Sequence, residues 1–367
     1  MVKLLHCADL HMGALFPDVG RRRGNLLREA QKKTWCNLLH FAGQENVDLV
    51  LVAGDLFDSN YLSSATVDFF LQSLEKTSLP ICVLPGTHDP YDRNSLYRSS
   101  KFSGYENLFI FTKPEVQSLC FPDMGLTVHA RASFSSGREH SPLKGLKPSG
   151  KTRYNVAVAH GGLKQERKDP DAFPFRSEEI EASGMDYIAL GHDHNFRELT
   201  AGRTRAFYPG PLETLRFGQE AGNALLITLE GDSVSVEKKR VGHFHWKEIS
   251  LDISSMTEKE IEEQLLSHKG QECLLRVIFH GMIPFYRMNR LDALKGHLEG
   301  YFFYLDFQFV HLSCSDRLPE KHLPGLSLPG EFHRLMQEKI RNAAPEDRKI
   351  YEEALWQGYA LLTEEST

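Results

Sequence analysis

Residues 2–11, VKLLHCADLH, join a short apolar segment directly to an aspartate and a histidine. The arrangement recurs twice, where apolar segments lead into GDLFD at 54–58 and into GTHD at 86–89. Helix-like patterns separate the three segments, so the chain is expected to begin with a βαβαβ unit. The expected strands cover residues 2–7, 48–52 and 80–84, and the expected helices cover about 25–44 and 63–75. Open α/β sheets bind ligands at the carboxyl ends of their strands, so this order of elements predicts a functional site.

Further along the chain, two more strand-like segments run into histidines. Residues 155–159 lead into His160, and residues 186–190 lead into GHDH at 191–194. The stretch 133–151 is rich in glycine, serine and proline, which predicts a flexible surface loop. The polar chemistry of this half of the chain is therefore also expected at strand ends.

The length of 367 residues exceeds what a single hydrophobic core usually organises. The pattern changes after about residue 240, where strand-like and helix-like segments alternate again, and a stretch rich in proline and glycine follows at 318–330. We expect a large α/β domain at 1–240, a smaller α/β capping domain at 241–318, and a linker with C-terminal helices at 319–367.

The composition is that of a folded globular protein, with 41% hydrophobic and 25% charged residues. A net charge of -6 and a pI near 6.3 give no general attraction for nucleic acid, so any polyanion site must be local. The six cysteines are scattered without a CxxC pair, which predicts reduced core thiols in a cytoplasmic protein. The first predicted strand begins at residue 2 and no apolar run approaches a membrane span, so neither a signal peptide nor a membrane helix is expected.

Five short motifs carry the chemistry. They are Asp9-Leu10-His11, Gly54-Asp55-Leu56-Phe57-Asp58, Gly86-Thr87-His88-Asp89, His160 and Gly191-His192-Asp193-His194. Any one alone is weak, because a strand-end aspartate often caps a helix and a buried histidine is often a satisfied core group. Together they are what two neighbouring divalent cations need: a bridging carboxylate, for which Asp55 is the natural candidate, flanked by oxygen and imidazole ligands. Asp58 and Asp193 are expected to be a loop cap and a solvated residue.

The pattern DxH, GDxxD, GNHD, H and GHxH resembles that of the calcineurin-like metallophosphoesterases, over roughly residues 1–240. The resemblance implies a four-layer αββα sandwich and assigns a role to each motif residue. The first metal would be held by Asp9, His11, Asp55 and His194, and the second by Asp55, Thr87, His160 and His192. His88 would contact the phosphate or protonate the leaving oxygen, and Asp89 would orient His88. Thr87 is the one departure, because the family has asparagine there.

The finer resemblance is to nuclease subunits of the SbcD type. It rests on HCADLHMG at 6–13, LVAGDLFD at 51–58, YPGPLETLRF at 208–217 and the second α/β domain. It implies a DNA exonuclease or endonuclease of a repair complex, in which a metal-bound hydroxide attacks phosphorus. It also implies an SbcC-type coiled-coil ATPase as partner and leaves room for a homodimer. The carboxylate and imidazole ligands suit manganese, with iron(II) or zinc as alternatives.

Local charge is compatible with DNA binding. Residues 131–170 contain nine basic residues and only three acidic ones. The basic residues are Arg131, Arg138, Lys144, Lys147, Lys151, Arg153, Lys164, Arg167 and Lys168, and the acidic residues are Glu139, Glu166 and Asp169. Further arginines follow the first motif at 21–23 and the third at positions 93 and 98. These residues are either phosphate contacts or solvated loop charges, and the sequence leaves both interpretations open.

Two other functions remain open. One is hydrolysis of a nucleotide or another small phosphodiester, for which the two C-terminal units would not be needed. The other is a weakly active scaffold whose second metal site is impaired, because the hydroxyl of Thr87 is shorter than an asparagine amide.

The C-terminal segment predicts two amphipathic helices, at 331–342 and 346–362. Their apolar stripes are Phe332, Leu335, Met336 and Ile340 in the first, and Tyr351, Leu355, Tyr359 and Leu362 in the second. The stripes either pack on this chain or dock on the ATPase.

Overall fold

The computed structural model describes residues 1–135, 140–164, 173–284, 286–314 and 328–344, together with residues 347, 348, 350, 351, 354, 355 and 358. The chain forms two compact units, Met1–Lys247 and Glu248–Thr367. The expected division into 1–240, 241–318 and 319–367 stays a prediction.

Two six-stranded sheets build the first unit. The first has the order β12-β11-β1-β2-β3-β4, and the second has the order β5-β6-β7-β8-β10-β9. The first contains β1 (Val2–Cys7), β2 (Leu49–Ala53), β3 (Ile81–Leu84), β4 (Leu108–Ile110), β11 (Asn223–Glu230) and β12 (Ser233–Arg240). The second contains β5 (Gln117–Phe121), β6 (Leu126–Ala130), β7 (Tyr154–His160), β8 (Tyr187–Gly191), β9 (Arg197–Glu198) and β10 (Arg205–Tyr208). Four neighbouring strands in each sheet, β1 to β4 and β6, β7, β8 and β10, run parallel, so their carboxyl ends share an edge.

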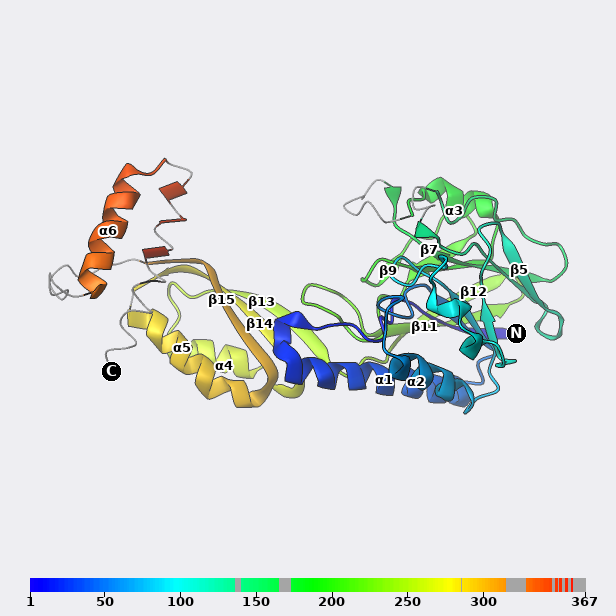
Figure 1. Ribbon diagram of the computed structural model, residues 1–367, viewed down its shortest axis with the longest axis horizontal. Coiled ribbons are helices and arrows are strands. Elements are labelled where there is room, and N and C mark those ends of the chain that lie inside the picture. The colour runs from blue at the N-terminus through cyan, green and yellow to red at the C-terminus, as the bar shows by residue number, and fades with distance from the viewer. Residues whose placement is uncertain are drawn as a thin grey trace. The chain divides into compact units, whose positions relative to one another are not determined.

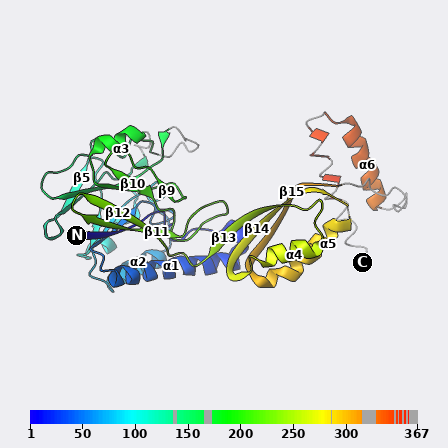
Figure 2. The ribbon, with the colours of Figure 1, turned by 180° about the vertical axis from the view of Figure 1, so that it is seen from behind.

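Helices cover the outer faces of the two sheets. In Figures 1 and 2, α1 (Gly20–Gln44) and α2 (Ser64–Leu74) lie on one side of the first unit and α3 (Ser177–Ser183) lies on the opposite side. One core packs the first sheet on α1 and α2, a second lies between the sheets, and a third packs the second sheet on α3. Strands buried on both faces are expected to be continuously apolar, as LVLVA in β2 is. The predicted four-layer αββα sandwich is confirmed.

Several local expectations need correction. Helix α1 begins at Gly20, five residues before the expected start, because its first turn includes the arginines at 21–23, of which Arg21 and Arg22 are exposed. The loop at 133–151 is not purely a surface element, since Leu143 and Leu146 are buried in the core beneath α3. Cys7, Cys36, Cys82, Cys120 and Cys273 are free thiols, but Cys120 is exposed rather than in the core.

The second unit contains a three-stranded sheet with the order β13-β14-β15 and two helices. Its elements are β13 (His245–Asp252), whose first residues belong to the first unit, α4 (Glu258–Leu266), β14 (Gly270–Ile283), α5 (Tyr286–Leu298) and β15 (Phe302–Cys314). Strands β14 and β15 are parallel and α5 connects them. Thr257 and Glu260 form the capping box that starts α4. Apolar residues of the sheet and both helices form one core.

The C-terminal part is described only in pieces. Helix α6 (Leu328–Asn342) takes in residues 328–330, which the sequence assigned to the linker. Most of the second expected helix, with Tyr359 and Leu362, lies outside the described residues. In the described part of the chain, no helix combines the length and the apolar character needed to span a bilayer.

His6 on β1 ties the two sheets of the first unit together. Its Nδ1 lies 2.8 Å from the hydroxyl of Tyr187, and its Nε2 lies 3.1 Å from the carbonyl oxygen of Leu190. A carbonyl only accepts, so Nε2 carries the proton and Nδ1 accepts from the tyrosine. Burial lowers the pKa of His6 to about 3, although the Leu190 carbonyl opposes this shift. The side chain is therefore neutral in the folded protein at pH 7.

This burial predicts a pH-dependent loss of stability. Below pH about 6.5 the unfolded chain protonates His6, whereas the folded chain does so only near pH 3, so stability falls across this window as pH decreases. Between pH 7 and pH 5 the loss is roughly 2 kcal/mol. His6→Gln should show a correspondingly smaller difference between urea unfolding at pH 7 and at pH 5, followed by fluorescence of buried Trp35.

The exposed His40 on α1 provides the matched control. His40→Gln should keep the pH dependence of the parent protein. An identical pH difference in the parent and in His6→Gln would show that His6 does not carry this titration.

Candidate metal centre

The five motifs meet where strands of the two sheets end. Asp9 and His11 follow β1, Asp55 follows β2, and His160 and Gly191 end β7 and β8. Backbone hydrogen bonds join the first two motifs: Asp9 N–H donates to the carbonyl of Gly54 at 3.1 Å, and His11 N–H donates to that of Asp55 at 2.9 Å. The first two motifs therefore lie together at the carboxyl ends of the strands, where the sequence predicted a functional site.

The backbone at this edge is strained. Positive φ angles occur at Asp9 (53°), His11 (44°), Asp55 (50°) and His192 (105°). Only two other non-glycine residues in the described part of the chain have such angles. Strain of this kind costs of order 1–3 kcal/mol per residue and is concentrated at functional sites.

Glycines permit the close approach of the motifs. A Cβ atom on Gly54 would lie 2.0 Å from Nδ1 of His160, and one on Gly86 would lie 2.1 Å from Oδ1 of Asp55. No other residue fits at either position without displacing a motif side chain. The site therefore requires the glycines of the motifs as well as their aspartates and histidines.

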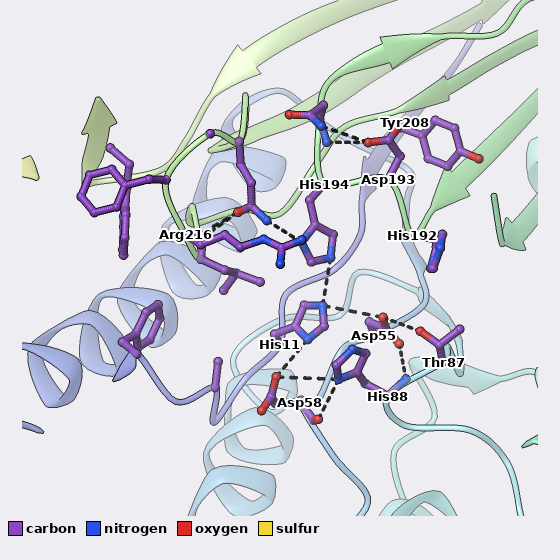
Figure 3. Close-up of a pocket in the computed structure, with 18 of the residues that line it drawn as sticks. His11, Asp55, Asp58, Thr87, His88, His192, Asp193, His194, Tyr208 and Arg216 are labelled. Atoms are coloured by element: carbon purple, nitrogen blue, oxygen red, sulfur yellow. Dashed lines mark hydrogen bonds and ion pairs between the residues drawn. The ribbon is translucent and has the colours of Figure 1, made fainter. Parts of the chain in front are cut away.

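One group of candidate ligand atoms comes from Asp9, His11 and His194, whose donor atoms lie within 4.8 Å of one another. Nε2 of His194 lies 3.3 Å from Nε2 of His11 and 3.9 Å from Oδ1 of Asp9. Figure 3 shows the two rings turned toward each other. Two imidazole nitrogens and a carboxylate that converge in this way are a suitable donor set for a divalent cation.

A second group comes from Asp9, Asp55 and His160. Oδ2 of Asp55 lies 3.3 Å from Nε2 of His160, and 3.6 Å from Nε2 of His11 in the first group. The hydroxyl of Thr87 donates to Oδ2 of Asp55 at 3.1 Å and lies 3.4 Å from Nε2 of His160. Nδ1 of His160 donates to a backbone carbonyl at 2.9 Å, which leaves Nε2 as its ligand atom.

The charges of the two groups are strongly coupled. Burial raises the pKa of Asp9 to about 7. Burial alone would also raise the pKa of Asp55, but His160 and His11 hold it well below its usual range. Burial alone would lower the pKa of His160, but Asp55 and Asp9 raise it to about 9. Buried carboxylates that depend on neighbouring protons for compensation suit a site where a cation supplies the positive charge.

Asp58 and Gln219 also act on the candidate ligands. Oδ1 of Asp58 lies 3.1 Å from Nδ1 of His11, whereas the sequence predicted a bond to a backbone amide. Nε2 of Gln219 lies 2.8 Å from Nδ1 of His194. Asp58 could have been identified from its place in the GDxxD motif, but no sequence signal marks Gln219.

His88 and Asp89 contact the loops of the second and third motifs. Nδ1 of His88 donates to the carbonyl oxygen of Asp58 at 3.1 Å, and the ring is half exposed. The carboxylate of Asp89 is buried and accepts from the backbone N–H of Phe57 and Gly86 at 2.9 and 2.7 Å. Asp89 therefore holds the loops of the second and third motifs together, and the described contacts do not link it to the ring of His88.

His192 and Asp193 border the two groups. The backbone N–H of His192 donates to Asp9, and its ring centroid lies 5.4 Å from that of His160. Asp193 accepts from the backbone N–H of Asn195 at 3.0 Å and is partly exposed, in keeping with the local role expected for it.

Two of the basic residues considered for DNA contact, Arg98 and Arg131, have partners within the described part of the chain. Arg131 donates to the carbonyls of Pro114 and Ser141 at 2.8 and 3.2 Å, and the guanidinium of Arg98 lies 4.2 Å above the ring of Tyr91. Both residues hold loops in place. Three others, Arg138, Arg167 and Lys168, lie outside the described residues.

Both groups open into a cavity of about 770 Å³ whose lining lies entirely in the first unit. His11, Asp55, Thr87, His88 and His194 line it. A buried donor set on the wall of an open cavity can hold cations and still admit an anionic substrate.

Comparisons with known proteins agree with this chemistry. A family model described as calcineurin-like phosphoesterase matches residues 2–196. The chain is 25% identical to an uncharacterized metallophosphoesterase, YhaO of Bacillus subtilis, over 80% of this chain and 75% of that protein. It is 23% identical to the DNA double-strand break repair protein Mre11 of Sulfurisphaera tokodaii, over 76% and 73% of the two chains. It is 26% identical to the SbcD subunit of the nuclease SbcCD of Bacillus subtilis, over 68% and 70%.

The contact between Asp58 and His11 predicts an indirect effect on metal binding. Asp58→Ala should weaken manganese binding about 10- to 100-fold, because the ring of His11 loses the carboxylate that orients it. Titration calorimetry measures the change. Asp193→Ala removes another carboxylate from the same cavity and should bind manganese as the parent protein does. Equal affinities in Asp58→Ala and Asp193→Ala would contradict the role assigned to Asp58.

Proposed function

The chain belongs to the calcineurin-like phosphoesterase family, and on this premise we propose that it is a two-metal phosphodiesterase that cleaves DNA. The observation that carries the proposal is the pair of ligand groups that share Asp9 and meet at Asp55 on the wall of one open cavity. The similarity to proteins named for double-strand break repair and for the SbcCD nuclease supports DNA as the substrate. A DNA substrate in turn implies a cytoplasmic protein.

The proposed ligands combine residues of the two groups with Thr87 and His192, which the family resemblance adds. Asp9, His11, Asp55 and His194 would hold the first cation, and Asp55, Thr87, His160 and His192 would hold the second. Oδ2 of Asp55, within 3.6 Å of both His11 and His160, supports its role as the bridge. Carboxylate and imidazole donors without a thiolate favour manganese, with iron(II) or zinc as alternatives.

Divalent cations at these positions would polarise the phosphate ester and lower the pKa of a bound water. The chain's own residues provide the rest. The backbone carbonyl of Asp58 accepts a hydrogen bond from Nδ1–H of His88, which leaves Nε2 of His88 for a phosphate oxygen or for the leaving oxygen. Asp89 keeps this loop in place through Gly86, two residues before His88.

Substitutions of Asp55 and of His88 should have different effects on manganese binding and on DNA cleavage. Asp55→Ala should lose both manganese binding and DNA cleavage, because Asp55 contacts both ligand groups. His88→Ala should keep manganese yet lose about 10²- to 10⁴-fold in cleavage of labelled linear DNA, which is the usual contribution of a general acid or base. Calorimetry and a nuclease assay on the same preparations provide the two measurements.

Three outcomes would change the interpretation. If the His88→Ala protein bound no manganese, His88 would be a metal ligand. Cleavage of nucleotides or small diesters without cleavage of any DNA would favour a small-molecule phosphodiesterase. Full manganese binding without hydrolysis of any ester by the parent protein would favour a scaffold.

Thr87 offers a test of the second cation. Asparagine reaches one carbon further than threonine, so Thr87→Asn should tighten manganese at this position. Thr87→Val, which keeps the shape and removes the hydroxyl, should weaken it, and His160→Ala should abolish it. Two equally tight manganese ions in the parent protein, unchanged in Thr87→Asn, would show that threonine does not weaken the site.

We further propose that the C-terminal helices dock an SbcC-type coiled-coil ATPase. Ile340 and Leu355 form a small core against which Phe332, Met336 and Tyr351 pack, so most of the predicted stripe is covered by this chain itself. Leu335 and Ile350 remain 47% and 61% exposed. A docking surface would therefore use these residues rather than the whole stripe.

The exposed pair can be tested directly. The double variant Leu335→Glu and Ile350→Glu should lose co-purification with the ATPase, since two charges would enter the interface. Leu26→Glu on α1, where the leucine is 51% exposed, serves as the control. Undiminished co-purification of the double variant would exclude this surface.

A further inference from the structure

The cavity beside the ligand groups has a second wall that the phosphoesterase chemistry does not use. This wall is apolar and consists of Leu15, Phe16, Pro17, Leu215, Phe217 and Trp246. The residues come from the segment after β1, from the loop between β10 and β11, and from β13. We call it the apolar wall.

Contacts between aromatic rings hold the apolar wall in place. The ring of Phe217 meets that of Trp246 edge to face at 4.8 Å, and Phe16 lies 6.3 Å from Trp246. Phe16 and Phe217 are buried, whereas Leu15 is 78% exposed. Nε1 of Trp246 is buried without a hydrogen-bond partner among the described residues. A rigid apolar surface with an exposed leucine is suited to a ligand that is flat and apolar.

The loop that supplies Leu215 and Phe217 is braced at both ends. The buried carboxylate of Glu213 accepts from the backbone N–H groups of His243 and Phe244. Oε1 of Gln219 accepts from the backbone N–H of Leu215 and of Arg216, at 3.1 and 3.2 Å. The wall is therefore held in a defined position next to the ligand group that contains His194.

Arg216 stands at the junction of the wall and the ligand groups. Figure 3 shows its side chain beside His194. The guanidinium is exposed and has no carboxylate partner among the described residues, whereas Arg197 in the same cavity lies 3.7 Å from Asp193. An unpaired guanidinium next to a phosphoesterase centre is a suitable contact for a further phosphate.

We propose that the apolar wall binds the base of the terminal nucleotide of a DNA strand and that Arg216 binds the phosphate next to the scissile one. The proposal rests on the proposed function and names the part of the substrate that the cavity selects. A cavity of about 770 Å³ is large enough for a nucleotide. Bases stack on apolar and aromatic side chains in single-stranded DNA. Only an unpaired base can reach the wall, so frayed or single-stranded ends are the preferred substrates.

The test compares strands that end in a base with otherwise identical strands that end in an abasic residue, at the 5′ or at the 3′ end. The parent protein should cleave the strand with the terminal base about 5- to 150-fold faster in kcat/KM at one of the two ends. Leu15→Ala and Trp246→Ala should bring this ratio toward one, and Trp246→Phe should give an intermediate value. Leu26→Ala is the matched control for loss of an exposed leucine. Because Leu15 is exposed, its variant should fold normally.

Arg216 is tested on the same strands. Arg216→Ala should raise KM for the strands about 10-fold, and it should raise KM less for bis(p-nitrophenyl) phosphate, which has no second phosphate. Arg203→Ala removes an exposed arginine that does not line the cavity and should leave both values unchanged.

A binding measurement separates this proposal from the proposed function. Anisotropy of labelled strands with the manganese-loaded His88→Ala protein gives affinities without cleavage. If the parent protein cleaves no DNA but the strand with the terminal base binds more tightly than the abasic strand, the proposed function fails and the wall remains a base site. Equal affinity for both strands would overturn the proposal. Binding of a free deoxynucleotide as tightly as the strand would also overturn it, because the occupant would then be a small nucleotide.

Discussion

The position of the Asp55 carboxylate is the constraint on which the rest of the site depends. Its Oδ1 accepts from the backbone N–H of His88 at 2.8 Å, and its Oδ2 lies within 3.6 Å of His11 and His160. One side chain thus connects motifs from both sheets. It fits only because Gly86 has no Cβ atom and because the backbone of Asp55 accepts a positive φ. The cores of the first unit must therefore hold two sheets at a fixed spacing against this local strain.

The fold could largely be predicted because its signals are local. Strands buried on both faces are uninterrupted apolar runs, and each of the central strands ends in a recognisable motif. The differences occur where local signals are weak. Helix α3 has only seven residues, too few turns for its periodicity to stand out, and α1 extends back through an arginine run that has no apolar stripe. Leu143 and Leu146 lie in a loop-like composition, although tertiary packing buries them.

For the site, the sequence predicted which side chains gather but not all of their partners. Residues that follow parallel strands must meet at one edge, which brings Asp9, Asp55 and His160 together for topological reasons. The carboxylate of Asp89 binds the backbone N–H groups of Phe57 and Gly86, which its place beside His88 in the sequence does not indicate. The contacts of Asp58 and Gln219 join residues 47 and 25 positions apart, and no local pattern encodes such pairs.

The two walls of the cavity differ in how the chain specifies them. The ligand groups stand at strand ends, where the sheets fix their geometry, whereas most of the apolar wall comes from two connections far apart in sequence. Such connections can change without disturbing the sheets, and folds of this kind vary substrate through loops while the scaffold keeps its chemistry. Membership of the family therefore accounts for the attack on phosphorus. We propose that the choice of ester depends on Arg216, Trp246 and their neighbours, and that the contacts of Glu213 and Gln219 hold these residues next to the ligand group that contains His194.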